Sequence, residues 1–347
     1  MAREPYYRTL SIAAAIAVTI GSTAAQAAVD GPKLGWNLAA YGPPRPATLA
    51  LDRLSDVVKA ETSGNFAIKV QYSEALAPAK EILDGTSIGA FELGWWVPTY
   101  APGKLPSLTA LGLPFLPLGD LMNATRAADA YYRHPVVARE HDVWNVDHIM
   151  VVFNPPYEFM GCGKAPDSIA AWKGLRVRAL GGGGTAMARL GAVPTTVTSP
   201  EVYGAMDRGI VDAAAITYGS FATYKIPEIA HWYTKGFALN YIVTAVVGNK
   251  SAHAKLPPQY QALIKNAVPI ATQAQAESVQ AEEDKAEADF QKRGLKMINI
   301  SAEMRQEMIR VGGTPVWDDW VKEMTEKGLP ARTLLDFLLA EGRKGAS

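Results

Sequence analysis

A run of strong helix-forming residues from Pro257 to Gly294 limits the folds open to this chain more than any other feature. A continuous helix of about 37 residues at 1.5 Å per residue would reach roughly 55 Å, which exceeds the width of one domain of this size. Such a helix would span two domains. Pro269 interrupts the run and leaves a second interpretation open, in which two shorter helices meet at the proline.

Strands alternate with helices in two separate parts of the chain. Leu51, Leu54 and Val58 mark one face of a helix before the β-rich segment "FAIKVQY", and a second alternation runs from "HIMVVFN" through "GLRVRAL" to "IVDAAAI". This alternation predicts βαβ units and mostly parallel sheets. Because a chain of 347 residues usually forms two domains, we expect two α/β blocks.

The N-terminus has the features of a secretory signal peptide. Arg3 and Arg8 precede an apolar stretch from Leu10 to Ile20, and Ala25-Gln26-Ala27 follows as a small-x-small cleavage site before Ala28. The alternative is a membrane anchor, but roughly a dozen apolar residues fall short of the ~20 that span a bilayer. We therefore expect residues 1–27 to be removed on export.

Charge and cysteine content narrow the class of protein further. The formal net charge is zero and no basic block occurs, so neither nucleic acid nor an anionic membrane is an expected partner. Cys162 is the only cysteine, so an internal disulfide is excluded. We expect Cys162 to be a buried small residue. An exported chain without disulfides fits the bacterial periplasm.

A glycine run after an apolar strand offers one enzymatic interpretation. Gly181, Gly183 and Ala186 fit G-x-G-x-x-A, and Glu201 follows at about the 20-residue spacing of a dinucleotide fingerprint. The helix after the glycines is short, Arg178 crowds the strand end, and no Walker lysine follows. An α/β oxidoreductase that binds a dinucleotide at Gly181–Gly184 is therefore the alternative function, although the helix N-terminus still favours anions.

Other catalytic signatures are missing from the sequence. The five histidines form no metal-binding motif, and no G-x-S-x-G elbow occurs, so we predict no catalytic residue, metal or cofactor. Aromatic residues are placed more suggestively, because several stand at strand ends, where open α/β sheets present ligand-contacting loops. These candidate pocket residues are Trp36 (beside Asn37), Trp95, Trp96 and Tyr218.

The block "DSIAAWKGLRVRALGGGGTAMARLGAVPTTVTSPEVYGAMDRGIVDAA" resembles the signature of the DctP-like solute-binding subunits of tripartite ATP-independent periplasmic (TRAP) transporters. "ILDGTSIGAFELG" and "LGLPFL" are similar to weaker landmarks of that family. The resemblance implies two α/β domains that are joined by hinge strands and one long helix and close on a ligand like a flytrap. It places domain I at residues 28–154 and 244–283, and domain II at residues 155–243 and 284–347.

The resemblance also implies a function and a site. The protein would be a non-enzymatic periplasmic receptor that delivers an organic acid to the small and large membrane permease subunits. Arg178 falls on the arginine that grips the ligand carboxylate, and its planar guanidinium suits a bidentate salt bridge. Asn37 matches a frequent polar ligand contact, and the glycines after Arg178 would leave room beside the ligand.

Departures from the family pattern bear on the ligand. Glu158 stands where sialic-acid receptors carry a second arginine, and its charge would repel a second anionic group. The family's "VDGxExP" reads "VDAAAIT" here, and the Glu-Trp pair of 2-oxoacid receptors is missing. With Trp36, Trp95, Trp96 and Tyr218, these departures favour a monocarboxylate with an apolar or aromatic body, or a zwitterion whose cation meets Glu158.

Overall fold

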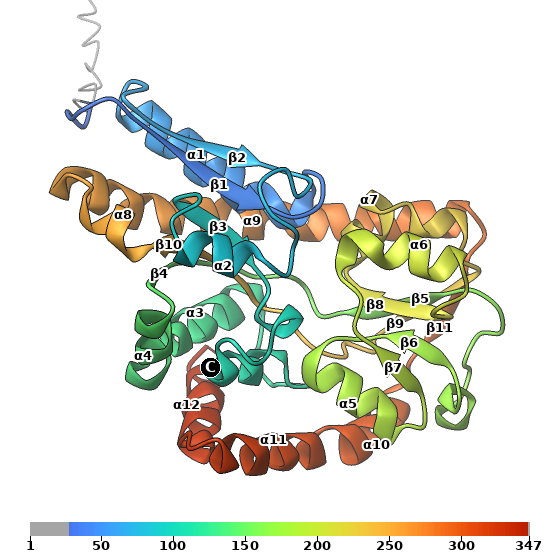
Figure 1. The fold of residues 1–347 in the computed structure, drawn as a ribbon. Helices are drawn as coiled ribbons and strands as arrows, with labels where there is room; N and C mark the ends of the chain where they lie inside the picture. The colour runs from blue at the N-terminus through green and yellow to red at the C-terminus, as the bar shows by residue number, and fades with distance from the viewer. Residues whose placement is uncertain (1–27, 346–347) are drawn as a thin grey trace, which may run out of the picture.

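The computed structural model describes residues 28–345, and the predicted signal peptide lies outside them. Within that range the strands form two separate sheets, each covered by helices (Figure 1). We call each sheet with its helices a lobe. No helix in these residues is both long and apolar enough to cross a bilayer.

The first lobe is built on a five-stranded sheet with the order β2-β1-β3-β10-β4. Strand β1 runs parallel to its neighbours β2 and β3, whereas β10 runs antiparallel to both of its neighbours. The strands are β1 (Leu34–Ala40), β2 (Phe66–Gln71), β3 (Leu93–Trp96), β4 (Val146–Val152) and β10 (Thr244–Asn249).

The second lobe is built on a six-stranded sheet with the order β11-β9-β5-β8-β6-β7. Here β5 runs antiparallel to both neighbours, and the other pairs are parallel. The strands are β5 (Glu158–Gly161), β6 (Arg176–Arg178), β7 (Val193–Thr195), β8 (Ala213–Ile216), β9 (Trp232–Lys235) and β11 (Lys296–Asn299). Because β5 and β10 each follow a crossing between the lobes, both insert against the direction of the βαβ strands, and the sheets are mixed rather than mostly parallel.

Helices cover both sheets and continue around the molecule. The first lobe carries α1 (Leu49–Glu61), α2 (Ile82–Ser87), α3 (Leu121–Tyr132), α4 (Pro135–Val143) and α8 (Lys250–Ala254). The second carries α5 (Gly181–Arg189), α6 (Val202–Asp207) and α7 (Tyr218–Thr223). The chain ends with α10 (Ala302–Gly312), α11 (Thr314–Glu326) and α12 (Ala331–Arg343), which lead from the second lobe back to the first (Figure 1). The predicted domain boundaries are not tested. Helix α12, which they place in domain II, packs against α3 of the first lobe.

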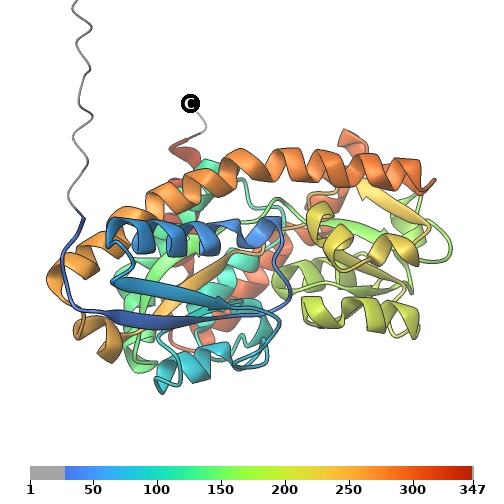
Figure 2. The ribbon, with the colours of Figure 1, turned by 90° about the horizontal axis from the view of Figure 1, so that it is seen from above.

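The long helix α9 (Pro258–Lys292) has 35 residues and is continuous through Pro269. It packs against α1 in the first lobe and α7 in the second, and Figure 2 shows it running along both lobes. Proline removes one backbone hydrogen bond from a helix interior. The buried residues Ala267 and Ala271 on either side of Pro269 hold the helix against the first lobe, so packing outweighs that loss. The prediction of one helix spanning both domains is confirmed.

Candidate functional site

Arg178, the last residue of β6, is the central feature of the region between the lobes. Its side chain is 0% exposed, Nε donates to the carbonyl of Val197 at 2.8 Å, and Nη1 donates to that of Ala215 at 2.6 Å. Nη2 makes only a long contact of 3.4 Å to Ser199 Oγ. Among residues 28–345, no ion pair involves Arg178. A buried cation without a protein counter-charge is costly and suits an anionic ligand.

Aromatic side chains of the first lobe extend toward Arg178. The ring of Tyr41, the residue after β1, stacks on Trp95 with centroids 4.3 Å apart and packs edge-on against Tyr100 at 5.8 Å. The Tyr100 hydroxyl lies 3.0 Å from Ser199 Oγ and accepts a hydrogen bond from the Ser199 amide at 2.8 Å. These hydrogen bonds connect the two lobes beside the guanidinium of Arg178.

A second arginine, Arg45, lies against the same aromatic rings. Its guanidinium carbon is 5.0 Å from the ring centre of Tyr41, 4.8 Å from that of Trp95 and 5.4 Å from that of Tyr224. Nη1 donates to the carbonyls of Tyr41 and Pro43, at 3.1 and 3.0 Å. Cation–π contacts and carbonyl groups hold Arg45 in place without neutralising its charge.

The tyrosines around the two arginines are neutral at physiological pH. Burial raises the pKa of Tyr224 to about 12 and raises the pKa values of Tyr41 and Tyr157 as well. The charges of Arg45 and Arg178 oppose this rise in pKa at both Tyr157 and Tyr224, so both guanidinium groups lie near these two hydroxyls. The hydroxyls can donate hydrogen bonds but do not balance the positive charge.

We call this group the interlobe cluster. Its members come from both lobes and from the crossing between β4 and β5, and they are Tyr41, Arg45, Trp95, Tyr100, Tyr157, Arg178, Ser199 and Tyr224.

The glycine run packs against the rest of the protein. A Cβ atom on Gly182 would lie 3.0 Å from Leu113 Cα and 3.2 Å from the carbonyl oxygen of Gly112, and one on Gly183 would lie 2.7 Å from Asn240 Nδ2. The glycines therefore let the segment around Leu113 and the crossing residue Asn240 approach the start of α5. Close packing thus accounts for Gly182 and Gly183 without a ligand, while the alternative of a dinucleotide site at Gly181–Gly184 and the expectation that the glycines make room for ligand stay untested.

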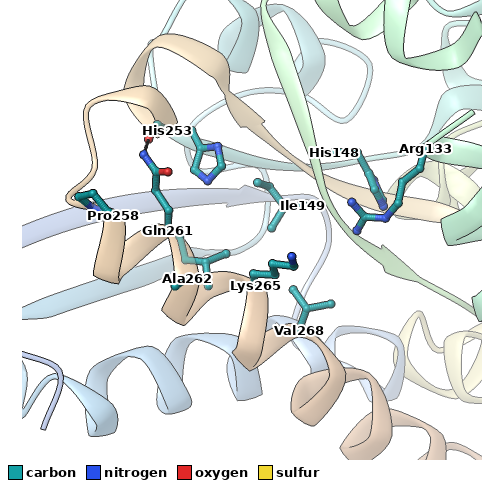
Figure 3. A pocket seen from close by; sticks show the side chains of 10 residues that line it. Arg133, His148, Ile149, His253, Pro258, Gln261, Ala262, Lys265 and Val268 are labelled. Carbon is teal, nitrogen blue, oxygen red and sulfur yellow. Dashed lines mark hydrogen bonds between the residues drawn. The ribbon is translucent and has the colours of Figure 1, made fainter. Parts of the chain in front are cut away.

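A cavity of about 440 Å³ lies elsewhere, on the first lobe between β4 and the N-terminal part of α9 (Figure 3). Arg133, His148 and Lys265 contribute polar groups to its wall, and Asp129, which His148 contacts at 2.8 Å, also pairs with Arg133. No residue of the interlobe cluster lines it. Arg133 in its wall is already paired with Asp129, whereas Arg178 has no carboxylate partner among the described residues, so the interlobe cluster is the stronger candidate site.

Neither a metal site nor a reactive cysteine is found among residues 28–345. No group of three or more His, Cys, Asp or Glu side chains there is placed to hold a metal ion. Cys162 is half-buried, its thiol donates to the carbonyl of Ile229, and burial raises its pKa. The thiol is therefore a poor nucleophile.

Comparison with known proteins decides the family. The sequence model of bacterial extracellular solute-binding protein family 7, DctP, matches residues 40–323. The chain belongs to this family. Its resemblance to TRAP solute-binding subunits is thereby confirmed.

Relatives of this DctP-family chain include a monocarboxylate 2-oxoacid-binding periplasmic protein from Nostoc sp. PCC 7120, 26% identical over 88% of the chain and 85% of the relative. A TRAP solute-binding protein from Rhodoferax ferrireducens T118, solved with copurified benzoate, has a TM-score of 0.82 at 20% identity and covers 90% of this chain and 100% of its own. A marine metagenome TRAP protein specific for aromatic acid ligands, solved with 3-hydroxybenzoate, has a TM-score of 0.81 at 21% identity, with coverages of 90% and 99%. The likeness to these structures supports the two-lobed fold.

Three of the predicted site residues of this DctP-family protein lie elsewhere in the first lobe. Trp36 packs edge-on against Phe66 at 5.3 Å, within the core. Trp96 is buried too, and because neighbouring strand residues face opposite sides, it points away from the side of β3 that Trp95 occupies. Asn37 Oδ1 accepts a hydrogen bond from Gln71 at 3.0 Å on the adjacent strand. The structure does not bring these three side chains into the interlobe cluster.

Glu158 and Tyr218 make their hydrogen bonds within the second lobe. The Glu158 carboxylate accepts hydrogen bonds from Thr234 Oγ1 at 2.6 Å and from the three backbone amides of residues 236–238 at 2.9–3.1 Å. Burial raises its pKa, and the four donors oppose that rise. The Tyr218 hydroxyl donates to the carbonyl of Thr234 at 2.6 Å, and its ring packs on Phe290 of α9. Hydrogen bonds hold both side chains in place within the second lobe. They leave the charge of Glu158 unneutralised, so its predicted roles toward the ligand stay predictions.

Six members of the interlobe cluster were missed from the sequence: Tyr41, Arg45, Tyr100, Tyr157, Ser199 and Tyr224. Tyr41 and Arg45 lie in "YGPPRP" directly after β1, and Tyr100 lies in "VPTYAP" directly after β3. The rule that selected aromatics at strand ends finds these three once it is extended a few residues into the following loops. Tyr157 and Tyr224 carry no comparable signal.

Proposed function

We propose that this chain is a periplasmic receptor that captures an organic acid with an aromatic or apolar body for delivery to the small and large subunits of a TRAP permease. The observation that carries the proposal is Arg178, fully buried and without a carboxylate partner among the described residues. A ligand carboxylate would supply the missing charge. The family of extracellular solute-binding proteins is consistent with this role.

The geometry of Arg178 favours a carboxylate over other anions. Carbonyl groups of Val197 and Ala215 fix Nε and Nη1, while Nη2 makes only one long contact. The Nη1–Nη2 edge therefore keeps donors for a bidentate pair with a planar carboxylate. Lysine would offer a point charge without this fork.

The rings beside Arg178 favour a ligand with an aromatic body. Tyr41, Trp95 and Tyr100 present aromatic surface next to the Ser199 contact. The proteins solved with benzoate and 3-hydroxybenzoate share the fold and hold ligands of this chemistry. The expectation of a single carboxylate rested on Glu158 and on the departure from "VDGxExP". Hydrogen bonds fix the Glu158 carboxylate without neutralising it, and that expectation stays a prediction.

Contacts from both lobes make binding depend on closure. The hydrogen bonds between Tyr100 and Ser199 form only when the lobes approach, and Arg178 lies directly beside them. A ligand that contacts both lobes shifts the population toward the closed form. Small-angle scattering is expected to give a smaller radius of gyration with ligand than without it.

The experiment that tests the proposal is calorimetry with benzoate, 3-hydroxybenzoate and pyruvate on wild type, Arg178→Ala and Arg178→Lys. Removing one partner of a buried ion pair costs about 3–5 kcal/mol, so we expect both variants to lose at least about 100-fold in affinity. Arg176→Ala is the control, because Arg176 lies two residues earlier and pairs with Asp212 at the surface. Binding by Arg178→Ala within threefold of wild type, or no binding of any organic acid, would overturn the proposal.

A further inference from the structure

We infer that Arg45 is a second anion-binding residue, so that the ligand carries a second acidic group in addition to the carboxylate that Arg178 binds. The inference rests on the proposed function. It extends that function from an aromatic acid to an aromatic dianion, with one cation supplied by each lobe.

Arg45 is fixed in position but its charge is not neutralised. Two carbonyls accept hydrogen bonds from Nη1, three rings surround the guanidinium, and no hydrogen bond to another described residue engages Nε or Nη2. No described carboxylate lies within ion-pair distance of Arg45. An arginine held in this way presents a rigid donor edge, which is what recognition of a second planar anion needs.

Two acidic residues, Glu74 and Glu158, bear on the charge of this region, and hydrogen bonds hold both carboxylates in place. Glu74 acts weakly on the Tyr224 hydroxyl, but its Oε1 accepts a hydrogen bond from the amide of Ala79 at 2.7 Å rather than pairing with Arg45. Glu158, which was expected to repel a second acidic group, is bound by Thr234 and the turn after β9. Both carboxylates are thus held by hydrogen bonds of their own, and neither forms an ion pair with Arg45.

Lobe closure brings the two cations toward one another. Arg45 belongs to the first lobe and Arg178 to the second, and the ring of Tyr224 from the second lobe lies over Arg45. Arg178 is fully buried and Arg45 partly buried, and neither has a carboxylate partner among the described residues. Their like charges therefore repel each other, which opposes closure of the empty site. A ligand with one anionic group neutralises only half of this charge, whereas a dianion neutralises all of it. The second acidic group of the ligand thus adds contacts with Arg45 and removes the repulsion between Arg45 and Arg178.

The test compares benzoate with the three benzenedicarboxylate isomers by calorimetry. Wild type is expected to bind at least one isomer at least tenfold more tightly than benzoate. Arg45→Gln should reduce the ratio of benzenedicarboxylate affinity to benzoate affinity to about one, and this ratio, not the affinity for benzoate alone, is the readout. Arg53→Gln, an exposed arginine of α1, is the matched control and should keep the preference.

The outcomes separate the two proposals. If wild type binds benzoate as tightly as every benzenedicarboxylate, the inference fails while the proposed receptor function stands. If Arg45→Gln weakens all ligands equally, Arg45 only holds the loop in place, and the inference fails as well. If Arg45→Gln does not fold, the same ligands are measured on Arg45→Lys, and the inference fails if that variant prefers benzenedicarboxylate as strongly as wild type does. If none of these four acids binds while 3-hydroxybenzoate does, the inference alone fails. If no organic acid binds, the proposed function fails together with the inference.

Discussion

The substitution Gly182→Ala tests whether the glycine run exists to let the two lobes touch. The added methyl would meet Leu113 Cα at 3.0 Å, Pro114 Cδ at 2.9 Å and the carbonyl oxygen of Gly112 at 3.2 Å. Two of these three atoms belong to backbone, so no flexible side chain can move aside. In an unconstrained helix the same change would stabilise the protein, because alanine is favoured over glycine by about 1 kcal/mol.

The expected magnitude follows from overpacking. Inserting one methyl group into a tightly packed contact costs about 1–3 kcal/mol. Opening the lobes would relieve the clash but would also break the hydrogen bonds of Asn240 Nδ2 to the carbonyls of Gly112 and Leu180, at 3.1 and 3.3 Å. From the unfolding entropy per residue, the loss corresponds to a decrease in Tm of about 2–4 °C for a chain of this length.

The assay is thermal unfolding of wild type, Gly182→Ala and Gly204→Ala. Gly204 lies within α6, where a new Cβ atom would meet only the guanidinium end of Arg208, which can move. The control is therefore expected to melt at the wild-type temperature or slightly above it. If Gly182→Ala also melts at or above that temperature, the close approach of the lobes at α5 is not what requires glycine.

Two further predictions concern stability. Glu158→Gln would turn an amide group toward the N–H groups of residues 236–238 and should lower the free energy of unfolding in urea by about 2–4 kcal/mol, whereas the exposed Glu323→Gln should change it by less than about 1 kcal/mol. Burial lowers the pKa of His141 to about 4, whereas its value in the unfolded chain is near 6.5. Between pH 6.5 and about 4 the unfolded state therefore binds one more proton than the folded state. The free energy of unfolding should fall by about 2–4 kcal/mol as the pH decreases through this window. His141→Phe should lose that part of the pH dependence, and an unchanged pH profile would contradict the assignment.

The sequence was sufficient for features that depend on local pattern. The length and composition of residues 258–292 predicted α9, and the spacing of Leu51, Leu54 and Val58 predicted the buried face of α1. Arg178 was selected by its motif. Trp95 and Trp96 illustrate the limit, since both end β3, but strand alternation sends only one of them toward the other lobe.

The remainder of the site depends on how distant segments meet. Tyr100 and Ser199 are 99 residues apart, and their contact exists only because two lobes pack face to face. Glu158 looked available because its four donors lie 76–80 residues further along the chain, in a turn with no recognisable motif. Similarly, the glycines suggested a ligand site because nothing local reveals that Leu113 approaches them.

Helix α9 connects the two lobes rigidly, so a small rotation of the helix would move the second lobe by a larger distance. Near its middle, Gln275 Nε2 donates to the carbonyls of Ala47 and Phe153, at 3.2 and 3.1 Å, where the helix leaves the first lobe. The remaining 17 or so residues extend roughly 25 Å beyond that pivot, so a rotation of about 10° would displace the far end by roughly 4–5 Å. A displacement of that size is larger than the hydrogen bond between Tyr100 and Ser199 is long. A bend of this size at Gln275 would move the second lobe by more than the length of a hydrogen bond without unfolding any strand.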